Sequence, residues 1–168
     1  IGSGVISDLT KNAAQTLELP YITIATAPSM NGYTSAMSAL TKNRIKKTLL
    51  VNTAKAIFAD IDILKKSPVD MIRSGLGDIV SKSVSNADWK LSEIIKHTYF
   101  CPIPFKLTDI TENLYLEAAE DIGEATEYGI KVLTDGIIRS GLSMTIVGIS
   151  SPSSGSEHLI SHYWDLMN

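Results

Sequence analysis

Residues 67–70, which read Ser-Pro-Val-Asp, mark the point where the pattern of this 168-residue sequence changes. Serine followed by proline and then an acidic residue is typical of a helix start, with serine as the cap and proline in the first helical position. After residue 70, apolar residues recur at helical spacing. The apolar positions of residues 124–148 indicate a central buried helix. Helices are predicted over residues 68–96, with interruptions near Gly75 and Gly77, over 109–121 and over 124–148.

The sequence ahead of residue 67 mixes helix and strand patterns. Residues 5–18 carry an apolar residue every fourth position, which predicts a helix. A short β-branched and aromatic run predicts a buried strand at 21–25, and two further short strands are predicted at 48–51 and 56–59. A loop rich in Pro, Ser, Asn and Gly follows the first of these strands.

This pattern predicts an α/β portion over residues 1–66 followed by an all-helical portion over residues 67–168. The sequence opens on a glycine turn and stops inside a helical pattern. We therefore expect a fragment cut at both ends.

Composition narrows the class of protein. The hydrophobic fraction of 44% is sufficient for a buried core, and the net charge of −3 gives no electrostatic case for nucleic acid binding. The two long uncharged stretches are rich in Ser, Thr and Gly and each contains proline, so no membrane span is expected. The single cysteine, Cys101, fits a reducing compartment, which favours a cytoplasmic protein.

Two polar segments of the first portion are candidate nucleotide contacts. Gly2, Ser3 and Gly4 precede the first helix, and small residues at a helix N-terminus let backbone amides approach a phosphate. Thr26, Ser29 and Asn31 follow a buried strand, where open α/β sheets bind ligands. An ordinary tight turn and an ordinary polar connector are the alternatives.

The second portion holds candidate metal ligands. Asp78 lies among apolar residues, where a carboxylate needs a partner or a metal ion, although Lys82, four positions later, is a sufficient partner. His158 and His162, also four apart, share a helix face and can reach one ion. The alternative is a pair of ordinary helical histidines, with Glu157 acting only as a cap in a second capping box at residues 154–157.

As a set, these segments resemble the dehydroquinate synthase-like and iron-containing alcohol dehydrogenase superfamily, and within it the sn-glycerol-1-phosphate dehydrogenase branch. The resemblance lies in five motifs: GSGVISDLTK from Gly2, PYITIATAPS from Pro20, AIFAD from Ala56, GLGD from Gly75 and SGSEHLISH from Ser154. It implies a Rossmann-like nucleotide-binding portion and a helical domain that binds metal and substrate.

The resemblance also implies roles for single residues. The cofactor NAD(H) or NADP(H) would be bound by Gly2, Ser3, Gly4, Asp8, Thr26 and Ser29. Asp78 and His158 would ligate a divalent metal ion, with a further histidine expected beyond Asn168. Asn31, Lys82 and His162 are weaker substrate candidates, Lys82 as a cation for a substrate phosphate. Relatives usually have aspartate in place of Asn31, and asparagine cannot serve as a base.

The expected activity is the metal-dependent, NAD(P)-linked interconversion of dihydroxyacetone phosphate and sn-glycerol 1-phosphate. The alternatives are a glycerol or polyol dehydrogenase, a dehydroquinate synthase-like lyase and a non-catalytic ligand-binding relative. An acid with histidines suits zinc, nickel or iron equally well. The expected partner is a small polyol phosphate, with NAD against NADP and a homo-oligomeric assembly left open.

Overall fold

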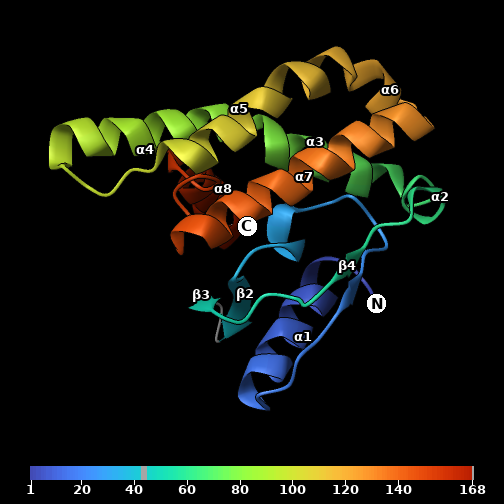
Figure 1. Ribbon diagram of the computed structural model, residues 1–168, viewed down its shortest axis with the longest axis horizontal. Helices are drawn as coiled ribbons and strands as arrows, with labels where there is room; N and C mark the ends of the chain where they lie inside the picture. The colour runs from blue at the N-terminus through green and yellow to red at the C-terminus, as the bar shows by residue number, and fades with distance from the viewer. Residues whose placement is uncertain (43–44, 168) are drawn as a thin grey trace.

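A computed structural model describes residues 1–42 and 45–167. Two small sheets lie between the first helix and the remaining helices, which then follow one another to the C-terminus (Figure 1). In chain order the elements are α1 (Gly4–Thr16), β1 (Thr23–Ile24), the 3₁₀ helix η1 (Asn31–Tyr33), β2 (Met37–Lys42), β3 (Ile45–Leu50), β4 (Ile57–Phe58), α2 (Ile61–Leu64), α3 (Val69–Val80), α4 (Lys82–Lys96), α5 (Pro102–Glu117), α6 (Ala119–Gly123), α7 (Glu127–Val147) and α8 (Ser156–Met167).

The sheets are small. β1 pairs with β4 in parallel, with Thr23 opposite Ile57, and β2 pairs with β3 in an antiparallel ladder. The three predicted strands are present with shifted ends, whereas β2 was not predicted. The predicted order of an α/β portion and a helical portion is thus confirmed in part. The domain boundary at residue 66 stays a prediction.

Helix α1 confirms the predicted helix, but its apolar stripe does not face the described core. Val5 and Leu9 are 72% and 53% exposed, whereas Ser7, Lys11 and Ala14 are buried. The packed side of α1 contacts β2 and η1. Sequence periodicity therefore identified the helix correctly, while the buried face is the one with small and polar residues.

Helix α7 is the centre of the helical layer, as predicted. It contacts α2, α3, α5, α6 and η1 and lies across the middle of the helices in Figure 1. Ile130, Leu133, Ile137 and Met144 are buried, whereas Tyr128, Leu142 and Ile146 are exposed, so the helix is buried on one side and not on most faces. The core around it consists of Ala25, Tyr33, Leu64, Ile72, Ile79, Tyr115, Ala118, Ile122, Ile130, Leu133 and Ile137.

The predicted interruption near Gly75 and Gly77 is wrong. Helix α3 continues through both glycines, and the break falls at Ser81, directly before α4. The predicted serine cap is also wrong, because Pro68 occupies the cap position and no side chain caps the helix. The hydroxyl of Ser67 is buried without a hydrogen-bond partner in the described structure. Gly75 thus reflects close packing against Pro28 and not a helix end, whereas Gly77 has no neighbouring atom that requires glycine.

The later helices also begin elsewhere than predicted. Helix α5 starts at Pro102, seven residues before the predicted 109, because proline is well tolerated in the first turn of a helix. At the start of α8, Glu157 accepts a hydrogen bond from the backbone of Gly155 at 3.1 Å. The glutamate of the predicted capping box therefore accepts a backbone N–H as expected, but that N–H belongs to Gly155 and not to Ser154.

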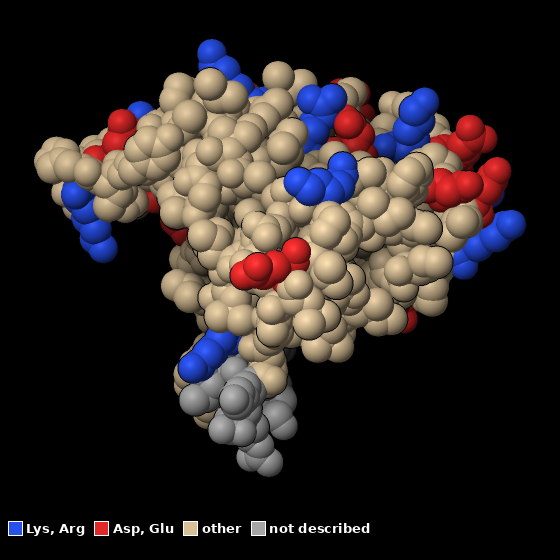
Figure 2. Space-filling model, turned by 60° about the horizontal axis from the view of Figure 1, so that its bottom comes forward, with Lys and Arg blue, Asp and Glu red and all other residues tan. Residues whose placement is uncertain are grey.

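The surface carries charges of both signs. On the face in Figure 2, Lys and Arg side chains alternate with Asp and Glu side chains, and uncharged residues cover most of the area between them. Within residues 1–42 and 45–167, no helix has the length and apolar character needed to cross a bilayer.

Candidate functional site

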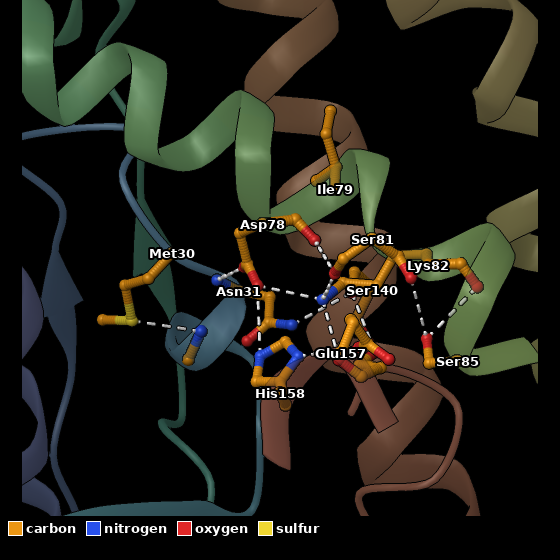
Figure 3. Close-up of polar contacts among 12 residues, drawn as sticks. Met30, Asn31, Asp78, Ile79, Ser81, Lys82, Ser85, Ser140, Glu157 and His158 are labelled. Atoms are coloured by element: carbon orange, nitrogen blue, oxygen red, sulfur yellow. Dashed lines mark hydrogen bonds and ion pairs between the residues drawn. The ribbon is translucent and has the colours of Figure 1, made fainter. Parts of the chain in front are cut away.

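The carboxylate of Asp78 is placed near the end of α3, where it faces the loop that follows β1. Its Oδ2 accepts a hydrogen bond from the backbone N–H of Asn31 at 2.8 Å, and its Oδ1 accepts one from Lys82 at 2.9 Å (Figure 3). The side chain is 15% exposed. The carboxylate therefore joins the helical layer to the strand-end loop and remains open on one side.

His158 reaches Asp78 from the other side. It lies in the first turn of α8, and its Nε2 is 3.9 Å from Oδ1 of Asp78. Its Nδ1 is 2.8 Å from Oε1 of Glu157. We assign the ring proton to Nδ1, because a carboxylate is an acceptor. The Nε2 lone pair then faces Asp78, and two electron-pair donors point at the same space (Figure 3).

Lys82 is the counter-charge of this site. Its side chain is only 3% exposed, and its ammonium donates to Asp78 Oδ1, to the hydroxyl of Ser81 at 3.3 Å and to the carbonyl of Ser153 at 2.8 Å. Burial lowers the pKa of Lys82, and the neighbouring Asp78 opposes that shift. The three acceptors match the three protons of an ammonium group.

Asn31 connects the strand-end loop to the helices. Its Nδ2 donates to Ser140 Oγ at 3.2 Å, and the hydroxyls of Ser140 and Ser153 are 2.9 Å apart. The carbonyl of Ser153 also accepts a hydrogen bond from the ammonium of Lys82. A continuous chain of polar contacts therefore connects Asn31 to Asp78. An aspartate at position 31 could not donate to Ser140 in this way.

The glycine turn at the start of the chain is held against the first strand. The N–H of Gly2 donates to the carbonyl of Ile24 at 3.1 Å, and Gly4 has a φ of +49°, a conformation that favours glycine. The Ser3 hydroxyl lies 2.6 Å from that of Ser29 and makes no cap bond to α1. The structure thus brings two predicted cofactor segments together at the N-terminus of α1.

Two other predicted cofactor residues lie in the loop after β1 and in α1. Thr26 is half-buried in the loop after β1, and Asp8 is 18% exposed in α1. The backbone carbonyl of Asp8 accepts a hydrogen bond from Ser38 at 2.9 Å. Their roles toward a nucleotide stay predictions.

Lys11 was not predicted as a site residue, and its side chain is fully buried. Its ammonium donates to the carbonyls of Gly32, Ser35 and Met37, which follow Asn31 along the chain. Desolvation lowers its pKa to about 8, against the opposing effect of Asp8, whose Oδ1 is 4.0 Å away. The sequence feature that could have identified Lys11 is its position on the same helix face as Ser7 and Ala14.

The donor set near Asp78 fits one metal ion in part. Bonds of about 2.0–2.2 Å from one ion to a carboxylate and an imidazole span up to roughly 4 Å, and the facing atoms are 3.9 Å apart. The ring of His162 packs edge-on against that of His158, with centroids 6.0 Å apart. Among the described residues no three His, Cys, Asp or Glu side chains are grouped closely enough for a metal ion. The pair therefore needs a further donor.

Known proteins resemble the chain over almost its whole length. A family model described as iron-containing alcohol dehydrogenase matches residues 1–68. A protein named glycerol-1-phosphate dehydrogenase (NAD(P)+) from Halalkalibacterium halodurans is 40% identical over 166 residues, which is 99% of this chain and 42% of the relative. Proteins of the same name from Bacillus subtilis and Pyrococcus horikoshii are 38% and 34% identical over 99% of the chain, which covers 42% and 48% of them.

Solved structures agree in fold. An iron-containing alcohol dehydrogenase from Corynebacterium glutamicum matches 99% of this chain and 44% of its own, with a TM-score of 0.74 and 22% identity. A glycerol dehydrogenase from Schizosaccharomyces pombe matches 82% of this chain and 39% of its own, with a TM-score of 0.67 and 21% identity. The chain spans less than half the length of these relatives. By sequence and by fold, it is similar to iron-containing alcohol dehydrogenases and to proteins named glycerol-1-phosphate dehydrogenase.

Proposed function

We propose that this protein is an NAD(P)-dependent, metal-dependent dehydrogenase that interconverts dihydroxyacetone phosphate and sn-glycerol 1-phosphate. The relatives with 34–40% identity carry the name of this activity. Because the chain spans only part of their length, the activity of the whole protein is inferred. The observation that carries the proposal is the approach of His158 Nε2 to Asp78 Oδ1, beside the loop that follows β1.

We propose that residues 1–66 are part of a Rossmann-like nucleotide-binding domain. The turn formed by Gly2, Ser3 and Gly4 would receive the pyrophosphate, since it combines small residues with the N-terminus of a 13-residue helix. Thr26 and Ser29 would line the nicotinamide end, a role supported by the contact between Ser29 and Ser3. Asp8 would border the same surface.

Asp78 and His158 would hold one divalent ion, with a third histidine supplied from outside these 168 residues. The ion would lower the pKa of the substrate hydroxyl and polarise the carbonyl, while the nicotinamide exchanges hydride. Asn31 orients Asp78 through its backbone N–H and can donate a hydrogen bond to substrate, but it cannot take up a proton. Lys82 and His162 remain candidates for substrate contact.

The test is the NADH- or NADPH-dependent reduction of dihydroxyacetone phosphate by the purified protein with zinc, nickel or iron added separately. We expect turnover with one of these metals, and its loss in Asp78→Ala and His158→Ala. Arg139→Ala, which removes an exposed ion pair with Asp135 on α7, serves as a folded control with unchanged turnover. Full turnover in Asp78→Ala would refute the proposal.

A glycerol dehydrogenase is the second candidate, and one observation favours it. The ammonium of Lys82 is buried and already has three acceptors, so it has no free proton for a substrate phosphate. Comparing kcat/KM for sn-glycerol 1-phosphate and glycerol separates the two candidates. A phosphate preference that is lost in Lys82→Ala favours the first, and equal or better use of glycerol favours the second.

A further inference from the structure

We infer that Glu157 is a positioning residue that fixes the His158 ring with Nε2 directed at Asp78. This inference rests on the proposed metal site. Glu157 Oε1 is 2.8 Å from His158 Nδ1, and the same oxygen accepts the N–H of Gly155 at 3.1 Å. One carboxylate oxygen is thus tied to the backbone at the start of α8 and, at the same time, to the ring.

The consequence for the ring follows from hydrogen-bond chemistry. An imidazole whose Nδ1–H is donated to a carboxylate keeps its lone pair on Nε2, and its rotation about the Cβ–Cγ bond is restricted. In α8 this leaves Nε2 3.9 Å from Asp78 Oδ1. Without Glu157, either ring nitrogen could carry the proton, and the ring could turn away from Asp78.

Glu157 lies where the start of α8 packs closely against α4. A Cβ on Gly155 would lie 2.7 Å from Glu157 Oε2 and 2.9 Å from the Ser85 backbone, so the close approach of α8 to α4 needs glycine there. Glu157 Oε2 itself is buried with no hydrogen-bond partner in the described structure.

Asp88 provides a matched control. It also places a carboxylate at the start of α8, where its Oδ2 accepts the N–H of Ser156 at 2.7 Å, and this hydrogen bond lowers its pKa. Unlike Glu157, it makes no hydrogen bond or ion pair with His158 in the described part of the chain. Asp88→Ala therefore weakens the helix start and leaves the ring hydrogen bond in place.

The experiment measures the zinc dissociation constant of the purified protein by competition with a chromophoric chelator, with no substrate or nucleotide present. Glu157→Ala should weaken zinc binding about 10–100-fold, and Glu157→Gln, which keeps an acceptor oxygen, should recover most of the loss. Asp88→Ala should bind zinc like the wild type. Thermal unfolding of each metal-free variant shows that it is folded.

Three results would overturn the inference. Zinc binding in Glu157→Ala as tight as in the wild type would remove the positioning role, while Asp78→Ala without zinc would leave the proposed function standing. Equal losses in Glu157→Ala and Asp88→Ala would assign the effect to the helix start. Equal losses in the Ala and Gln variants would assign it to charge. Unchanged zinc binding in Asp78→Ala would defeat the proposed function itself.

Discussion

At the scale of single residues, the site depends on two buried lysines with different surroundings. Lys82 has a carboxylate partner in Asp78, whereas Lys11 is solvated mainly by the carbonyls of Gly32, Ser35 and Met37. These carbonyls lie just after Asn31, whose backbone holds Asp78. Lys11 therefore acts on the site through the shape of the loop.

The pKa of Lys11 gives a testable pH dependence. Burial lowers this pKa from 10.5 to about 8, so between these values the unfolded chain binds more protons than the folded chain, and the free energy of unfolding rises with pH. The rise attributable to Lys11 is at most about 3 kcal/mol. Urea unfolding of the wild type and Lys11→Met at pH 7.5 and pH 10 measures it, because the difference between them cancels shared titrations.

The wild type should gain stability over Lys11→Met as the pH rises. A stability gap that is the same at both pH values would contradict the placement of Lys11 as a buried, charged side chain. Lys55 is on the exposed surface, so the stability difference between the wild type and Lys55→Met should be the same at both pH values.

At the scale of elements, close approach of backbones aligns the site. Helix α3 crosses the loop after β1 at Gly75, where a Cβ would overlap the carbonyl oxygen of Pro28. Helix α7 approaches η1 in the same way at Gly141, next to the carbonyl oxygen of Asn31. These two contacts set the distance between the helical layer and the loop, and so the distance from Asn31 to Asp78.

Two glycines of α3 provide a matched pair of substitutions. Gly75→Ala should lower the free energy of unfolding by about 3 kcal/mol, because the overlap forces α3 away from Pro28. A Cβ at Gly77 would meet no atom within 4 Å. Gly77→Ala should therefore raise the free energy of unfolding by roughly 0.8–1 kcal/mol through helix propensity. Chemical denaturation of both variants is the measurement, and a harmless Gly75→Ala would show that the contact is not tight.

At the scale of the whole molecule, the sequence predicted the elements better than their contacts. The apolar pattern of residues 124–148 identified the central helix α7, and β-branched runs identified three strands. The pattern in α1 identified the helix and missed its buried face, since Lys11 is buried by carbonyls far along the chain. Local spacing carries no information about such contacts.

The candidate site was predictable for the same reason only in outline. Asp78 and His158 were proposed through resemblance, and the ion pair with Lys82 was the structural alternative at helical spacing. The structure contains both contacts at one carboxylate. The roles of Ser140 and Ser153 in connecting Asn31 to Lys82 could not be read from the sequence, because three separate segments meet there.

The most direct test of a shared metal ion is a double-mutant cycle on the zinc dissociation constant, with Asp78→Ala, His158→Ala and the double variant. If both side chains bind one ion, each single substitution should abolish tight binding, and the double variant should lose little more. Losses that simply add, or tight binding that persists in either single variant, would contradict a common ion between α3 and α8.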